Sequence, residues 1–252
     1  MGTKYVYTFS SVGHMFITLV HSIKTLTDYV PPEDVIVFYT PPRDPTHREV
    51  VADLGVDLRE VGNRTEAFAA FDERPSHYGA KTHLCSVDAD RVVFLDCDTL
   101  VFDDPATVAS GPFEFKARPG SARLGEDWRR LFDRFDEPLV EWMPNAGFLV
   151  FDDGLHREIE SDWLRYLDVD VEIGATSVDH REQYALALAV AGHDLARMDA
   201  NEHVFEWRET PPAGGCVYHQ GRLFDDSIGS IREALRATAE QVSIKIDKLR
   251  HR

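Results

Sequence analysis

The chain has 252 residues, 43% hydrophobic and 11% aromatic, so it is long enough to bury a substantial core. Acidic residues outnumber basic ones 44 to 27 and give a formal net charge of −17. This balance argues against nucleic acid as the main partner, because phosphate binding needs a concentrated basic face. Arginine exceeds lysine 21 to 6 and aspartate exceeds glutamate 26 to 18, which favours a surface adapted to high salt.

The chain shows no pattern typical of a membrane protein. No apolar stretch is long enough to span a bilayer, and the first residues pass into a strand pattern without a signal peptide. Cys85, Cys97 and Cys216 form no Cys-x-x-Cys pair, which fits a reducing compartment and no disulfide framework. We therefore expect a cytoplasmic protein with no transmembrane segment, and the sequence leaves a homo-oligomer open.

The first hundred residues alternate between strand and helix patterns. Asp44 before Pro45 predicts a helix N-cap, and Gly55 lies where that helix should have ended. Strands are predicted at 4–9, 35–39, 56–61 and 92–95, and the other helices at 16–26 and 78–87. This order predicts an α/β fold with a mostly parallel central sheet and helices on both faces.

Beyond residue 103 the alternation is less regular. Short strands are predicted at 113–117, 147–151 and 217–219, and helices at 126–135, 155–167, 181–191 and 226–252. No internal repeat or linker interrupts the pattern, so the sequence predicts a single domain over residues 1–252.

The most distinctive segment is the apolar strand 92–95, which ends in two carboxylates, Asp96 and Asp98. Parallel-sheet enzymes bind ligands beyond the carboxyl ends of their strands. Residues i and i+2 of an extended chain point the same way, so both aspartates can face one cation. Oxygen ligands of this kind suit Mg²⁺ or Mn²⁺, the ions that link carboxylates to substrate phosphates.

Two enzyme classes use such a pattern. The segment from Asp96 to Leu100 resembles the signature of haloacid-dehalogenase-type phosphohydrolases, in which Asp96 would be the nucleophile. Their motif usually lies near the start of the catalytic domain, however, whereas about a hundred residues precede it here. Their late acidic motif has one counterpart, Asp225-Asp226, which opens the last predicted helix.

The second class is the metal-dependent glycosyltransferases of the GT-A fold. Residues 81–85 and 94–101 resemble the glycogenin and galactosyltransferase type of family 8, and further matches follow in that family's order: 7–10, Asn145-Ala146-Gly147, Glu182-Gln183 and 217–222. The resemblance spans roughly residues 4–224. It implies a GT-A fold with a nucleotide-sugar-binding half at about 1–103 and an acceptor half at about 104–225, before the C-terminal helix.

The resemblance also implies roles for individual residues. Asp96, Asp98 and His219 would hold Mn²⁺ or Mg²⁺, and Asn145, Glu182 and Gln183 would lie beside the reacting sugar. Small residues after Asn145 would let that sugar approach the backbone. The expected donor-binding residues are Thr8, Ser10, His14, Lys81, Gly221 and Arg222.

The function that we expect is transfer of a sugar from a nucleotide diphosphate donor, in first place a UDP-sugar, with retention of configuration. The acceptor is a glycan, a lipid or a protein that the sequence does not identify. Trp128, Trp142, Trp163 or Trp207 could stack on a sugar ring, although most are expected in the core. The phosphohydrolase and a non-catalytic nucleotide-sugar-binding domain are the alternatives.

The charge balance leads to a first prediction. A charge of −17 must be screened for the compact state to persist, so the melting temperature should rise as KCl goes from dilute to molar concentration. Thermal unfolding followed by circular dichroism checks this, with an uncharged osmolyte as control. A flat profile would identify an ordinary acidic protein instead of a salt-adapted one.

Overall fold

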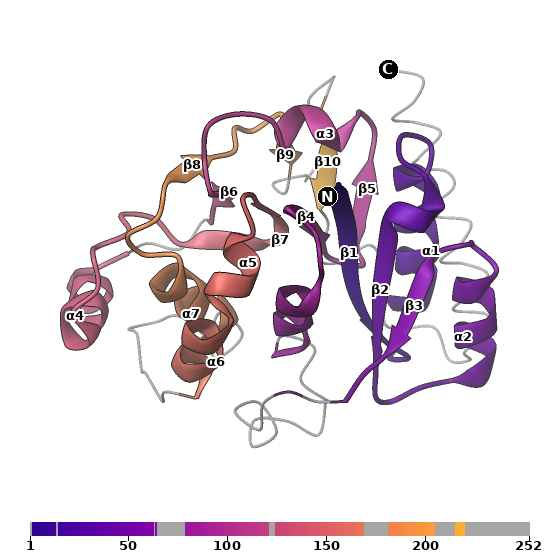
Figure 1. Cartoon of the computed structure of the whole chain (residues 1–252), viewed down its shortest axis with the longest axis horizontal. Coiled ribbons are helices and arrows are strands. Elements are labelled where there is room, and N and C mark those ends of the chain that lie inside the picture. The colour runs from indigo at the N-terminus through magenta and orange to yellow at the C-terminus, as the bar shows by residue number, and fades with distance from the viewer. Residues whose placement is uncertain are drawn as a thin grey trace.

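A seven-stranded sheet forms the centre of the molecule (Figure 1). This computed structural model describes residues 2–13, 15–62, 64, 79–120, 124–168, 181–204 and 215–219. The strand order is β3-β2-β1-β4-β7-β6-β8. The strands are β1 (Thr3–Ser10), β2 (Val35–Thr40), β3 (Asp57–Glu60), β4 (Arg91–Leu95), β6 (Phe115–Pro119), β7 (Pro144–Phe151) and β8 (Leu195–Arg197).

The sheet is mostly parallel, as predicted. Strands β3, β2, β1 and β4 run parallel to one another, and β6 and β8 also pair in parallel. Strand β7 lies between β4 and β6 and is antiparallel to both. A second, three-stranded sheet has the order β5-β10-β9, formed by β5 (Thr99–Val101), β10 (Val217–His219) and β9 (His203–Val204).

Helices cover both faces of the central sheet, because its strands bury alternate side chains on opposite sides. On β4, Val92 and Phe94 belong to one core cluster, and Val93 and Leu95 belong to the other. The first cluster includes side chains of α4, α6 and α7, and the second includes side chains of α1, α2 and α3. The prediction of helices on both faces is confirmed.

The helices are short. They are α1 (Met15–Leu26), α2 (Pro45–Ala52), α3 (Pro105–Val108), α4 (Glu126–Phe135), α5 (Leu155–Glu158), α6 (Glu160–Leu167) and α7 (Arg181–Ala189), with 3₁₀ helices η1 (Pro32–Asp34) and η2 (Gly79–Ser86). In the described part of the chain, no helix has the length and apolar character needed to cross a membrane.

Several predicted elements have the expected bounds, and others differ. Helix α4 and strand β10 coincide with their predicted ranges, and the Asp44 side chain caps α2 by accepting from the backbone N–H of Thr46. The single helix predicted at 155–167 is instead divided at Ile159 into α5 and α6. The segment expected as a helix at 78–87 forms the 3₁₀ helix η2. The predicted helix at 226–252 lies outside the described residues.

A chain of buried hydroxyl groups joins β1, α1 and the turn after β4. The Oγ of Ser22 lies 2.9 Å from the hydroxyl of Tyr7 and 2.9 Å from Oγ1 of Thr99. The Thr99 hydroxyl in turn donates to the backbone carbonyl of Asp96 at 2.8 Å. These bonds tie helix α1 to the loop that carries both aspartates.

Replacing Thr99 with valine keeps the side-chain shape but removes its hydroxyl. The Ser22 hydroxyl and the Asp96 carbonyl then each lose a buried partner, so we expect a loss of about 1–3 kcal/mol in the free energy of unfolding. Denaturant titration measures the change. The matched control is Thr27→Val, since the Thr27 hydroxyl bonds to the Lys24 carbonyl at an exposed position and should cost less than about 0.5 kcal/mol. Equal losses in both variants would contradict a stabilising network.

Candidate metal and donor site

Asp96 and Asp98 lie in the turn that follows β4, at the carboxyl end of a central parallel strand. The backbone N–H of Asp96 donates to the Gly147 carbonyl at 2.8 Å, which continues the pairing of β4 with β7 for one residue. Cys97 points inward instead, with its Sγ 3.1 Å from the Thr8 carbonyl. This alternation buries the cysteine and leaves both carboxylates partly exposed.

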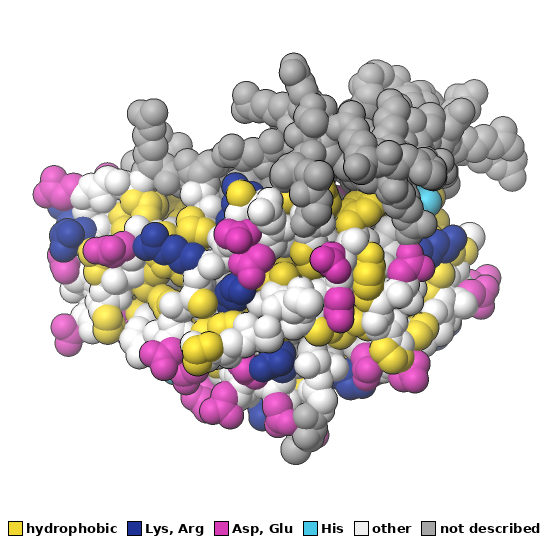
Figure 2. All heavy atoms as spheres, turned by 90° about the horizontal axis from the view of Figure 1, so that it is seen from above, with side chains coloured by type: hydrophobic (Ala, Val, Ile, Leu, Met, Phe, Trp, Pro, Cys, Tyr) yellow, Lys and Arg dark blue, Asp and Glu magenta, His cyan; other side chains and the backbone are white. Residues whose placement is uncertain are grey.

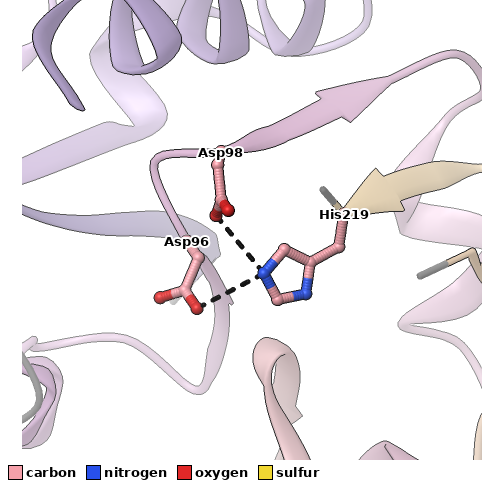
Figure 3. Close-up of side chains that lie close together, drawn as sticks. All are labelled: Asp96, Asp98 and His219. Carbon is pink, nitrogen blue, oxygen red and sulfur yellow. Dashed lines mark ion pairs between the residues drawn. The ribbon is translucent and has the colours of Figure 1, made fainter. Parts of the chain in front are cut away.

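His219 lies beside these carboxylates although it follows them by about 120 residues in the sequence. Strand β10 pairs antiparallel with β5, and the register sets His219 opposite Thr99, the residue after Asp98. Its Nε2 lies 3.3 Å from Oδ1 of Asp98 and 3.8 Å from Oδ2 of Asp96 (Figure 3). The three expected metal ligands therefore lie together despite their separation in sequence.

The donor atoms of these three side chains suit one divalent ion. Ligand atoms of Asp96, Asp98 and His219 all lie within 4.8 Å of one another. Two carboxylates and an imidazole form a mixed oxygen and nitrogen set that Mn²⁺ accepts, and carboxylates also bind Mg²⁺. Burial by itself lowers the pKa of His219, but the Asp98 and Asp96 carboxylates outweigh burial and raise this pKa above its usual value. A bound cation would replace the imidazole proton and relieve the same negative charge.

Gly147 makes room for the His219 ring. A Cβ at position 147 would overlap Cε1 and Nδ1 of the imidazole. The family resemblance implies that small residues here admit a sugar, whereas in the structure the immediate neighbour of Gly147 is the His219 ring. The side chain of Asn145 accepts from the Gly147 backbone N–H at 3.0 Å and so stabilises the same segment.

Lys81 on η2 places a buried ammonium beside this cluster. Its Nζ lies 3.1 Å from Oδ1 of Asp96 and 3.3 Å from Oε1 of Glu182, and it donates to the Ala146 carbonyl at 3.0 Å. Burial acts to lower the pKa of Lys81, but Asp96 and Glu182 outweigh that effect and raise it. The lysine therefore stays charged and joins three separate segments of the chain.

Glu182 lies near the start of α7 and is almost fully buried. Burial raises its pKa to about 7, although the Lys81 ammonium acts in the opposite direction. While Oε1 contacts Lys81, no described residue offers a hydrogen bond to Oε2. Oε2 is therefore a buried carboxylate oxygen with no hydrogen-bond partner among the described residues. Gln183 follows it and is partly buried.

The remaining predicted residues are either buried or outside the described part of the chain. Thr8 and Ser10 are buried at the end of β1, and the Thr8 backbone contacts Cys97 between the two aspartates. The donor residues His14, Gly221 and Arg222 lie outside the described residues, as does Trp207. Trp128, Trp142 and Trp163 are buried in the core, so none of these three is exposed to stack on an acceptor sugar.

A further histidine at this site, His203, stacks on His219. Their ring centroids are 5.5 Å apart and the ring planes differ by 16°. His203 is fully buried. No sequence motif marks this residue, because a two-residue strand brings it to the site.

The contact between Gly147 and His219 leads to a prediction. Gly147→Ala should displace the imidazole and weaken Mn²⁺ binding roughly tenfold or more, in the range found when groups supporting a metal ligand are lost. Calorimetric titration with Mn²⁺ measures the effect. Gly62→Ala is the control, since no atom of the described residues lies within 4 Å of a Cβ at position 62. Unchanged affinity in a folded Gly147→Ala protein would show that this packing does not position the ring.

Comparison with known proteins identifies the fold. No protein-family model matches the chain, and no curated protein matches it significantly. Among solved structures, the galactosyltransferase LgtC with donor and acceptor sugar analogues is 18% identical, with 95% of both chains covered and a TM-score of 0.60. Mouse xyloside xylosyltransferase 1 is 8% identical over 88% of this chain and 98% of its own, with a TM-score of 0.52. The glycosyltransferase GlyE of Streptococcus pneumoniae TIGR4 is 13% identical over 98% of this chain and 64% of its own, with a TM-score of 0.58. The chain therefore has the GT-A fold of these glycosyltransferases.

Proposed function

We propose that this protein is a metal-dependent glycosyltransferase that moves a sugar from a nucleotide diphosphate donor, in first place a UDP-sugar, to an acceptor with retention. One observation carries the proposal: Asp96, Asp98 and His219 converge at the carboxyl end of β4 in a GT-A fold. The proposed setting is the cytoplasm, because the three cysteines are free and buried, which fits a reducing compartment.

The two aspartates and His219 would hold Mn²⁺ or Mg²⁺ beside the donor diphosphate. Such an ion acts as a Lewis acid and neutralises the negative charge of the leaving diphosphate. Lys81 adds a fixed positive charge, since its buried ammonium is held next to Asp96 and does not have to reorganise during the reaction. Thr8 and Ser10 at the end of β1 would contact the nucleotide, together with His14, and Gly221 and Arg222 would contact the phosphates.

The sugar would lie between the metal ligands and α7. Oε2 of Glu182, which has no hydrogen-bond partner among the described residues, is the atom best suited to accept a hydrogen bond from a sugar hydroxyl, because Oε1 is already held by Lys81. Gln183 and Asn145 would complete that side of the site. Glu182 stands where family 8 usually has an aspartate, and its side chain is one methylene longer. The contact of Oε1 with Lys81 fixes the position of the Glu182 carboxylate.

The two alternatives are less well supported. A phosphohydrolase with Asp96 as nucleophile gives no role to His219, whose Nε2 faces both carboxylates. It also lacks support from the fold, since the matching structures above are glycosyltransferases. A non-catalytic domain leaves unexplained why a set of possible metal ligands and a buried ammonium lie together, beside a carboxylate oxygen that no described residue hydrogen-bonds.

Product analysis distinguishes the three functions. The protein is incubated with Mn²⁺ and a panel of nucleotide sugars, and released nucleoside diphosphate and free phosphate are both quantified. We expect nucleoside diphosphate from at least one UDP-sugar, no free phosphate, loss of the signal with EDTA and recovery with Mn²⁺. Free phosphate would establish the phosphohydrolase instead, and binding without either product would establish the non-catalytic domain.

Removing one of the proposed metal ligands should weaken the Mn²⁺-dependent binding of the donor nucleotide. Asp98→Asn and His219→Ala should each weaken Mn²⁺-dependent binding of UDP at least tenfold while the melting temperature stays close to that of the wild type, because both side chains lie at the edge of the core. Isothermal calorimetry with and without Mn²⁺ measures this coupling. Asp136→Asn is the matched control, since Asp136 is exposed with a φ of 57°, a conformation that asparagine also tolerates. Wild-type affinity in Asp98→Asn would refute the metal assignment.

A further inference from the structure

His203 occupies a fixed place in the small sheet. Strand β10 is the middle strand, with β5 and the two aspartates on one side and β9 with His203 on the other. His203 is opposite Val217 in register, so its ring meets His219 as a diagonal neighbour across the strands. The same ring contacts Phe148 of β7 edge-on, at a centroid distance of 5.6 Å and an angle of 82°.

The His219 imidazole is confined by packing. His203 stacks along the ring at 5.5 Å, and the backbone at Gly147 is so close that a Cβ there would overlap Cε1 and Nδ1. These two contacts come from different strands, β9 and β7. Together they restrict rotation of the ring about its Cβ–Cγ bond and leave Nε2 directed at Asp96 and Asp98 (Figure 3).

Such confinement matters for a metal ligand. Metal-binding histidines usually donate their second ring N–H to a carboxylate or carbonyl, which fixes the ring orientation. No residue in the described part of the chain forms a hydrogen bond with Nδ1 of His219. Within that part of the chain, the orientation of the His219 ring therefore depends on packing contacts, and the aromatic packing contact comes from His203.

We infer that His203 is a positioning residue of the proposed metal centre: its ring, stacked on His219, holds Nε2 toward the two aspartates. The inference rests on the proposed function, since it takes Asp96, Asp98 and His219 as the ligands of one ion. His203 itself acts through His219 and does not bind the metal.

Mn²⁺ affinity in three variants tests the inference. His203→Leu fills the space without a flat ring and should weaken Mn²⁺ binding about tenfold, whereas His203→Phe keeps a ring and should stay within about threefold of the wild type. The control is His156→Leu, which replaces another fully buried histidine, one whose Nε2 bonds to the Val87 carbonyl and whose ring contacts Phe151. This variant should lose stability yet keep its Mn²⁺ affinity.

A second measurement needs no metal. Nuclear magnetic resonance of histidine-labelled protein reports the order of the His219 ring, whose signal is identified as the one lost in His219→Gln. We expect increased ring mobility in His203→Leu and wild-type behaviour in His203→Phe.

The outcomes separate the inference from the proposed function. If His219→Ala abolishes Mn²⁺ binding while His203→Leu keeps wild-type affinity and ring order, the inference is overturned and the proposed function stands. Equal weakening in His203→Leu and His203→Phe also overturns it, because the ring is retained in the second variant. A wild-type protein that binds no Mn²⁺ overturns the inference and the proposed metal centre together.

Discussion

The buried ammonium of Lys81 is the constraint on which the rest of the site depends. It contacts carboxylates from the turn after β4 and from α7, and it also bonds to the Ala146 carbonyl of β7, just before the part of that strand that pairs with β4. A buried charge persists only when it is paired and hydrogen-bonded. When Glu182 is ionised and His219 is neutral, the carboxylates of Asp96, Asp98 and Glu182 with the Lys81 ammonium leave two negative charges, which a divalent cation would balance. The site is thus complementary to a dication in net charge as well as in ligand geometry.

The antiparallel strand β7 explains how distant segments meet at this point. Since β7 runs against β4, its first residues lie at the end where β4 finishes, as the pairing of Leu95 with Phe148 shows. A parallel strand in the same place would put Asn145 and Gly147 at the opposite edge of the sheet. Figure 2 shows charged side chains of both signs scattered over the described part of one face, with no continuous basic area among them.

Local patterns in the sequence predicted much of the fold. The apolar run 92–95, the Asp44 cap and helix α4 depend on neighbouring residues, so periodicity and capping chemistry were sufficient. Strands β5 and β9 were not predicted, because two or three residues carry no periodicity and their pairing comes from β10. The 3₁₀ form of η2 was not predicted either; the hydroxyl groups of its Thr82 and Ser86 bond to carbonyls three residues earlier. Neither the contact of Gly147 with His219 nor the stack of His203 had a sequence signal.

The acidic composition and the ligand set have different consequences for metal choice. A charge of −17 attracts every cation, and at high ionic strength that attraction is screened within a few ångströms and favours none of them. Selectivity must then come from the ligands themselves. Two carboxylates alone would accept any hard cation, including Mg²⁺ and Ca²⁺. As a ligand, the imidazole nitrogen of His219 would be softer and would favour transition metals, so the groups that confine this ring in the proposed metal centre, Gly147 and His203, would also bear on which ion the site retains.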